Sequence, residues 1–271
     1  MMAAEFGASA EDLARMREAL GVDKPLLVQF KDFLVNAARG DLGRSLFTQR
    51  PVTTQIAEQL PSTVGLAVVS LIIALIIGVP IGVIAAVRAN TWVDAGSMLL
   101  ALLGVSMPSF WLGLILIYVF SFKLGWLPSA GVGGFSRIIM PAFALGFSAS
   151  AVIARMTRSS MLEVLRQEYI TTARAKGLAY RLVVVRHALR NALIPLVTIA
   201  GLQFAGLLGG AVIIETVFAR KGLGSLTIQA ILQKDYPLVQ GTILVVALAY
   251  ILVNLAVDVS YAFLDPRIRY E

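Results

Sequence analysis

Cysteine is missing from this chain of 271 residues, and histidine occurs once, at His187. A zinc site, a cysteine nucleophile and a disulfide bond are therefore excluded. No serine lies in the G-x-S-x-G pattern of many hydrolases, and the phosphate-binding pattern G-x-x-x-x-G-K-[ST] does not occur. If this chain takes part in active transport, another chain must hydrolyse the nucleotide.

Charge is also scarce, since only 14% of the residues are charged and 58% are hydrophobic. The mean hydropathy is +0.82, well above that of ordinary soluble proteins. Residues 62–87 carry no charged side chain and are long enough to cross a bilayer as a helix. Similar windows follow at 97–122, 138–157, 192–214 and 238–263. One such window could be a buried helix of a soluble protein, but five together predict an all-α, polytopic transmembrane bundle.

The few charges predict the orientation of this bundle. Residues 155–190 hold eight Lys and Arg against only Glu163 and Glu168, so we expect this basic, helix-prone loop to be cytoplasmic. Alternation of the helices then places 88–97 and 264–271 inside, and 1–59, 123–137 and 215–237 outside. The net charge of +7 could suggest nucleic acid, but the bases gather beside membrane helices. We therefore expect no nucleic-acid partner.

Residues 1–59 conflict with this orientation, because no hydrophobic segment or signal-peptide pattern precedes them to direct export. Either later helices carry this region across, or a first membrane helix is missing; we favour the second explanation. Within the region we expect helices at about 10–20 and 25–38, the second amphipathic. A third amphipathic helix, 51–60, leads into the membrane.

Prolines and glycines punctuate the apolar windows. Pro80, Pro108 and Pro141 are expected to mark kinks or helix starts, although Pro80 and its glycines also suit close packing against a neighbour. The glycines near 201–210 could pack against another helix or line a translocation path. Glu215 and Asp258 are the acids nearest to membrane depth, which raises a proton-coupled secondary transporter as an alternative function. Neither acid has a partner acid one turn away.

Several sequence segments together resemble one protein family over essentially the whole chain. They are GDLGRSLFTQRPV, MPSFWLGLILIY, EYITTARAKG, GGAVIIETVFARKGLG, QKDYPLVQG and LDPRIR. In this order they resemble the permease subunits of ABC importers for dipeptides, oligopeptides and nickel, and among these the B-type subunit. The resemblance implies a type I ABC importer permease fold, of which five membrane helices are visible here. It also implies that the family's first helix is absent, through truncation or a misassigned start.

What the resemblance implies about partners is specific. A second, C-type permease completes the pore, two ABC ATPase subunits use ATP and Mg, and an extracytoplasmic solute-binding protein delivers the solute. This chain itself would be no enzyme and would bind no cofactor or metal. The family's EAA-type segment, which docks in a groove on the ATPase, matches a short run of residues here. These are Glu168, Tyr169, Thr172, Ala173, Arg174, Ala175, Lys176, Gly177 and Leu178.

The expected organisation is therefore an extracytoplasmic region, 1–59, and a transmembrane permease domain, 60–271, with a cytoplasmic coupling loop at 158–191. The resemblance places the chain in the inner membrane of a bacterium or archaeon, with the C-terminus in the cytoplasm. Small residues and Gly177 in the coupling segment suit close approach of a partner, and Gly177 is expected to end its helix in a left-handed conformation. Arg174 and Lys176 can pair with acidic residues of the groove.

Overall fold

The structure is a computed structural model and describes residues 24–264 of the chain. In this range the chain is helical apart from its turns and an isolated antiparallel bridge between Arg44 and Pro51. The helices are α3 (Leu26–Ala38), α4 (Val52–Val87), α5 (Trp92–Ser106), α6 (Ser109–Leu116), η1 (Ile117–Lys123), α7 (Ser136–Leu165), α8 (Glu168–Ala175), α9 (Tyr180–Leu182), η2 (Val183–Leu189), α10 (Arg190–Val217), α11 (Leu223–Leu232) and α12 (Tyr236–Leu264).

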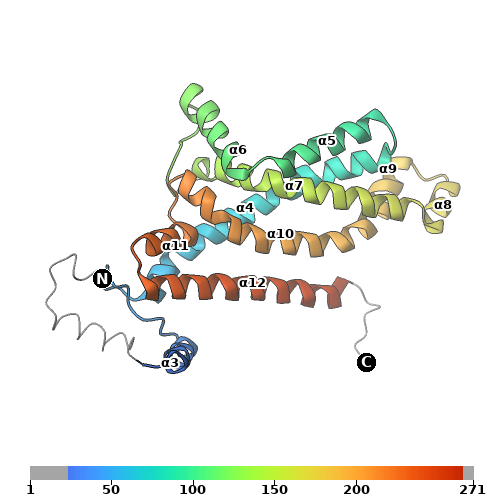
Figure 1. The fold of residues 1–271 in the computed structure, drawn as a ribbon. Coiled ribbons are helices and arrows are strands. Elements are labelled where there is room, and N and C mark those ends of the chain that lie inside the picture. The colour runs from blue at the N-terminus through green and yellow to red at the C-terminus, as the bar shows by residue number, and fades with distance from the viewer. Residues whose placement is uncertain (1–23, 265–271) are drawn as a thin grey trace, which may run out of the picture.

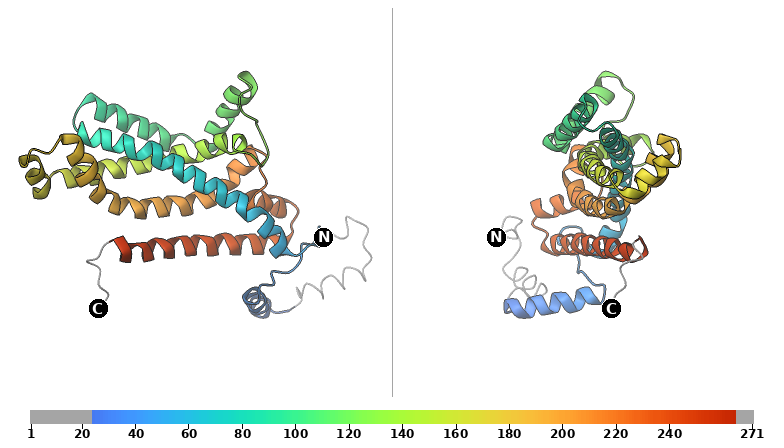
Figure 2. Two further views of the ribbon diagram at one scale, coloured as in Figure 1. Left: turned by 180° about the vertical axis from the view of Figure 1, so that it is seen from behind. Right: turned by 90° about the vertical axis from the view of Figure 1, so that its right-hand side faces the viewer.

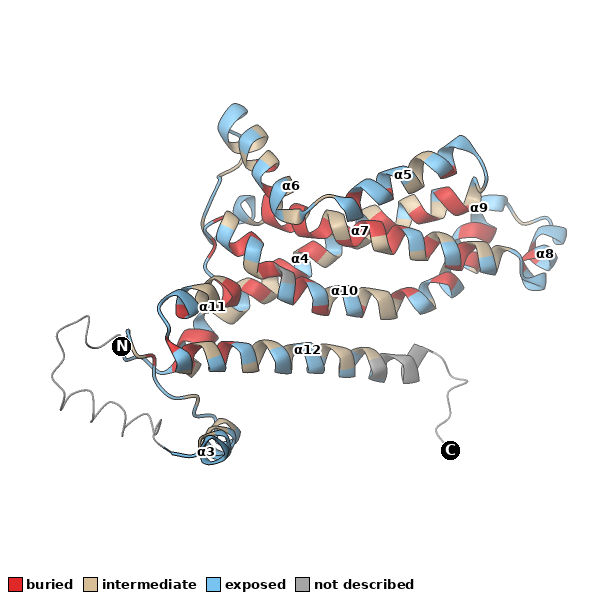
Figure 3. Cartoon of the chain, viewed as in Figure 1, coloured by how far each residue is buried: buried red, intermediate tan, exposed pale blue. Residues whose placement is uncertain are grey.

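The long helices α4, α7, α10 and α12 form a bundle, with the short helix α8 at one end and α11 at the other (Figure 1). We call these the α8 end and the α11 end. Helix α7 is central, because 61% of its most apolar stretch is buried, whereas the corresponding value for α12 is 17% (Figure 3). Among residues 24–264, four helices are long and apolar enough to span a membrane, and the bent pair of α5 and α6–η1 would make a fifth, compared with the five spans that the hydrophobic windows predicted.

Close contact between α4 and α7 forms the centre of this bundle. A Cβ atom added to Gly78 would lie 2.6 Å from the Ser150 carbonyl oxygen, and one added to Gly82 would lie 2.5 Å from that of Ala154. The two glycines therefore let the helix backbones approach closely, as small residues do in membrane helix pairs. Of the two explanations given for Pro80 and its glycines, close packing against a neighbouring helix therefore holds for Gly78 and Gly82.

The second hydrophobic window, 97–122, is a broken span. Helices α5 and α6–η1 meet at an angle of 96°. Met107 between them has the extended conformation that a residue before proline prefers, and Pro108 directly precedes α6. The prediction that Pro108 marks a kink or a helix start is confirmed, while Pro80 and Pro141 lie inside α4 and α7.

Four expectations for the segments between and before the windows have different outcomes. The helix expected at 25–38 is α3, whereas the one expected at 10–20 lies outside the described residues. The helix expected at 51–60 is not separate: α4 runs from Val52 to Val87 with Pro61 inside it, which neighbouring helices permit in membrane proteins. The basic loop is also shorter than 155–190, because α7 continues to Leu165 and α9 begins at Tyr180.

Helix α3 lies apart from the bundle near the α11 end, and its axis crosses the axes of the long helices (Figure 2). Its polar residues gather on one side, but none of its residues is buried. Leu26 and Phe30 are 82% and 60% exposed. The amphipathic pattern is thus present, although no other part of residues 24–264 covers the apolar face of α3.

Candidate functional site

The predicted coupling segment forms helix α8 and the turn that follows it. Gln167 precedes the helix in an extended conformation, and Glu168 begins it. Gly177, after the helix, has a φ of +76°, and its N–H donates to the Arg174 carbonyl at 2.9 Å. A left-handed φ favours glycine because it has no Cβ, so the expected helix stop at Gly177 agrees with the backbone geometry.

Two side chains on the inner face hold α8 in place. Ile170 is fully buried and Ala173 is 7% exposed. They belong to an apolar cluster with Met161 from α7 and with Val183 and Ala188 from η2. Ala173, which the sequence placed in the docking segment, therefore fixes the position of α8 instead of presenting its own side chain at the surface.

The other predicted coupling residues lie at the surface of this end of the bundle. The Arg174 guanidinium lies 5.4 Å from the centre of the Tyr180 ring, and the Asn191 side-chain amide donates to the Tyr169 hydroxyl at 2.7 Å. Leu178 is partly buried. The exposed residues are Glu168, Tyr169, Thr172, Arg174, Ala175, Lys176 and Gly177. A short, anchored helix, with Arg174 and Lys176 at its C-terminal end, is thus displayed at the α8 end.

At the α11 end, the Glu215 carboxylate links α10, α4 and α11. It is fully buried, accepts a hydrogen bond from the Thr63 hydroxyl at 2.5 Å, and accepts another from the Ser225 backbone N–H at 3.0 Å. The Thr63 oxygen in turn accepts the Leu223 N–H at 2.8 Å. Gly222 is required beside it, because an added Cβ would lie 2.1 Å from a Glu215 oxygen. This arrangement is that of a structural carboxylate that satisfies the N-terminal N–H groups of α11.

A second buried carboxylate at the same end, Asp235, holds the segment before α4. It accepts hydrogen bonds from the Ser45 hydroxyl at 2.5 Å and from the Leu46 N–H at 3.2 Å.

Arg220 is buried at the same end of the bundle. Burial lowers the pKa of its guanidinium, while the negative charge of Glu215 acts in the opposite direction and raises it. Within residues 24–264 no group of three or more His, Asp or Glu side chains is placed to hold a metal ion.

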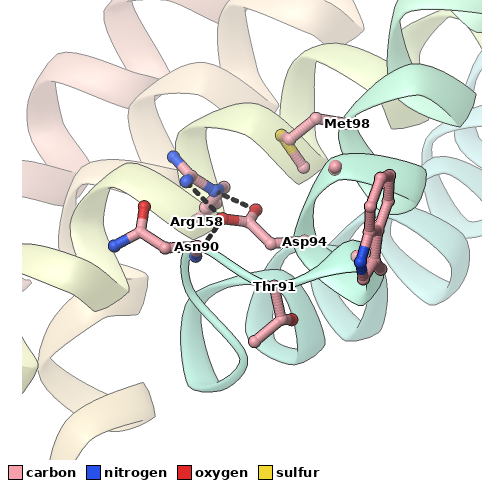
Figure 4. A pocket seen from close by; sticks show the side chains of 7 residues that line it. Asn90, Thr91, Asp94, Met98 and Arg158 are labelled. Atoms are coloured by element: carbon pink, nitrogen blue, oxygen red, sulfur yellow. Dashed lines mark hydrogen bonds and ion pairs between the residues drawn. The ribbon is translucent and has the colours of Figure 1, made fainter.

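A third polar contact joins α5 to α7. Arg158 donates from Nε to one Asp94 oxygen at 2.6 Å and from Nη2 to the other at 2.7 Å, while the Asn90 N–H donates to Asp94 at 2.9 Å. The pair lines an open cavity of about 720 Å³ beside Trp92 and Met98 (Figure 4). Arg158 was predicted to lie in the basic coupling loop, but it belongs to α7 and faces a helix.

Comparison with known proteins assigns this architecture. Residues 78–270 match the family described as the binding-protein-dependent transport system inner membrane component. The chain belongs to this family. It is 46% identical to the glutathione transport system permease protein GsiC of Escherichia coli (strain K12), over 97% of this chain and 86% of that protein. It is 45% identical to a putative peptide transport system permease protein of Brucella abortus (strain 2308), over 98% of this chain and 87% of that one.

Solved structures agree on the fold. The chain resembles a chain of the inward-facing MetNI methionine ABC transporter with a TM-score of 0.68, at 22% identity, over 78% of this chain and 96% of that chain. It also resembles an amino acid ABC transporter solved with histidines, with a TM-score of 0.57 at 16% identity, over 80% of this chain and 95% of that one. The predicted type I importer permease fold is confirmed, and the protein is a permease component of a binding-protein-dependent ABC importer.

Family membership favours the importer over a proton-coupled transporter, and the surroundings of Glu215 agree. In the sequence, Glu215 is a lone acid near the end of an apolar run. In the fold, the hydroxyl of Thr63, which is 152 residues away in the chain, donates a hydrogen bond to it. The side chain of Asp258 lies outside the described part of the chain. The sequence analysis did not identify Asp94 as a candidate residue. The feature that could have identified it is its position as an acid in the short segment between two apolar windows.

Proposed function

We propose that this permease imports peptides, including tripeptides of the size of glutathione, and that α8 receives the force of ATP hydrolysis from ATPase partners. Similarity to a glutathione and a peptide permease supports the solute class. In an importer of this kind a binding protein delivers the solute, so the permease need only accept a class of related molecules. The pathway itself would form between this chain and a second, C-type permease.

The display of α8 is the observation that carries the coupling proposal. Ile170 and Ala173 anchor the helix in an apolar cluster, so a force applied to α8 reaches α7 and η2 without loss in a flexible loop. The opposite surface carries Arg174 and Lys176, which suit an acidic groove on an ATPase. We infer that Glu168–Leu178 docks there, and that two ATPase subunits, not this chain, hydrolyse ATP with Mg.

The orientation follows from this assignment. If α8 faces the cytoplasm, then the turn 88–91 and the end of α12 face it too, because these lie at the α8 end (Figure 1). Helices α3 and α11 and the buried carboxylates Glu215 and Asp235 then lie on the extracytoplasmic side, where the binding protein docks. Lys and Arg are concentrated near α8, in agreement with the charge bias of membrane proteins.

Charge reversal on α8 tests the coupling proposal. The complex carrying Arg174→Glu and Lys176→Glu should lose ATPase subunits on purification, because two attractive contacts become repulsive. A matched control reverses two exposed lysines at the α11 end, Lys221→Glu and Lys234→Glu, and should keep its ATPases. Equal ATPase recovery and equal ATP-driven peptide uptake for both variants would refute docking through α8.

The solute class is tested separately with the purified complex in proteoliposomes. Together with its binding protein and internal ATP, the complex should accumulate labelled dipeptides, longer peptides or glutathione. Uptake of an inorganic or sugar solute but of no peptide would refute this class while leaving the importer assignment unchanged.

A further inference from the structure

The ion pair between Asp94 and Arg158 stands apart from the other ion pairs among residues 24–264. Those pairs, Lys24–Asp32 and Arg50–Glu58, join exposed side chains that are eight residues apart in the chain. Asp94 and Arg158 are 64 residues apart, and their side chains are 5% and 28% exposed. A bidentate, largely shielded pair of this kind fixes both distance and direction between two helices.

The position of Arg158 connects this pair to α8. It lies seven residues before the end of α7 at Leu165, and α8 begins three residues after that end. Helices α4 and α7 pack through glycines with almost no space between them, so α7 moves together with α4. Arg158 is therefore a charged contact on a rigid unit close to the segment proposed to receive force.

Helix α5, by contrast, contacts this unit along one narrow face. Only Asp94, Ala101 and Gly104 of its residues are buried. An apolar cavity of about 90 Å³ lies between α5 and the α4–α7 pair, with Ile77, Leu100 and Phe147 among its lining residues. Ala101 and Gly104 hold the later part of α5 against Ala151 and Ala154 of α7, whereas the ion pair is the directional polar contact that holds its first turn.

The far end of α5 links this ion pair to the other end of the bundle. Helix α5 continues through the 96° bend into α6, where an added Cβ at Gly113 would lie 3.0 Å from the Phe218 ring at the end of α10. The broken span thus extends from the α8 end to the C-terminal end of α10, next to Glu215. Movement of its first turn with α7 would be transmitted toward the α11 end.

We propose that Asp94 and Arg158 are positioning residues for transport, and that their ion pair makes α5 follow α7 when the ATPases close. This inference rests on the proposed coupling through α8. The pair does not touch the solute and hydrolyses nothing; it remains closed through the cycle and converts movement of α7 into movement of the broken span. Its loss leaves ATP hydrolysis running but disconnected from transport.

Neutralising both partners separates this role from a role in folding. The variant Asp94→Asn/Arg158→Gln leaves no unpaired buried charge, so it should assemble with ATPases and hydrolyse ATP. We expect peptide transported per ATP to fall by about fivefold or more, the lower end of typical coupling between sites. Arg155→Gln, an exposed arginine one turn earlier on α7, is the matched control and should couple normally.

A covalent tether provides the rescue, because the chain has no cysteine of its own. A Cβ at Gly104 would lie 3.0 Å from that of Ala151, so the two helices need to separate by only about 0.5–1 Å to reach the roughly 3.5–4.5 Å that a disulfide spans. Gly104→Cys/Ala151→Cys, oxidised in the neutralised background, should restore transport per ATP, and reduction should abolish it again. The same tether in the otherwise unchanged protein should permit transport.

Four results would overturn the proposal. Transport per ATP could be unchanged in the neutralised variant, or that variant could fail to assemble, which would make the pair a folding element only. A tether that forms but does not restore coupling would show that holding α5 to α7 is not what transport requires. A tether that blocks transport by the unchanged protein would show that α5 must move relative to α7. Failure of the unmodified chain to bind ATPases would instead refute the proposed function.

Discussion

Substitution of Gly82 by alanine tests the view that α4 and α7 move as one unit. The added Cβ would lie 2.5 Å from both the Ala154 carbonyl oxygen and the Thr157 Cβ, and 3.0 Å from the Arg158 nitrogen. Two of these three atoms belong to the α7 backbone, which cannot rotate away as a side chain can. Since carbon atoms prefer separations of about 3.5–4.0 Å, the helices must separate by roughly 1 Å.

The energetic cost follows from two opposing effects. Overpacking of a well-filled interior costs about 1–3 kcal/mol. Replacing glycine by alanine inside a helix returns about 0.5–1 kcal/mol, because glycine loses more backbone entropy on folding. The free energy of unfolding of Gly82→Ala should therefore fall by about 1–2 kcal/mol. Gly65→Ala, also in α4, is the matched control, because nothing lies within 4 Å of its added Cβ.

Unfolding of the purified permease by SDS in mixed micelles, followed by circular dichroism, measures both variants under one condition. Gly65→Ala should be as stable as the unchanged protein or up to about 1 kcal/mol more stable. Gly82→Ala should unfold at a lower SDS fraction and should also reduce transport. If the two variants unfolded alike, close contact between α4 and α7 would not exist in the protein and the rigid-unit argument would fail.

The remaining predictions concern the two ends of the bundle. Gly177→Ala forces a Cβ into a φ of +76°, so the turn after α8 should lose about 1 kcal/mol and ATPase recovery should fall; Gly40→Ala, at a φ of +81°, should strain its own turn without lowering recovery. Glu215→Gln replaces one acceptor oxygen by an amide donor facing Thr63 or the Ser225 N–H, so thermal unfolding should show a loss of about 1–3 kcal/mol. If that loss is absent while proton-driven transport is abolished, Glu215 is a proton carrier and not a structural carboxylate.

The spans and the helix stop could be predicted from sequence because their causes are local. Long apolar runs define the membrane helices wherever they pack, and Pro108 breaks its helix through its own ring and missing N–H. The helix stop at Gly177 is local in the same way, because the left-handed conformation depends on this one glycine having no Cβ.

The polar contacts could not be predicted, because each depends on residues far apart in the chain. Arg158 was counted with the loop charges, since charge bias reports the side of the membrane and not the helix that a given arginine faces. Thr63 and Glu215 meet only when α4 crosses α10, and no spacing in the sequence encodes that crossing. Ala173, expected within the docking segment, packs against Met161 and Val183, and no sequence spacing indicated these neighbours.

ATP-driven peptide uptake by the purified complex is the most direct test of the central claim. This chain should copurify with a second permease and with ATPases, and in proteoliposomes with its binding protein the complex should accumulate peptide only when ATP is supplied. Accumulation by a homo-oligomer of this chain without nucleotide, driven by a proton gradient, would contradict the account.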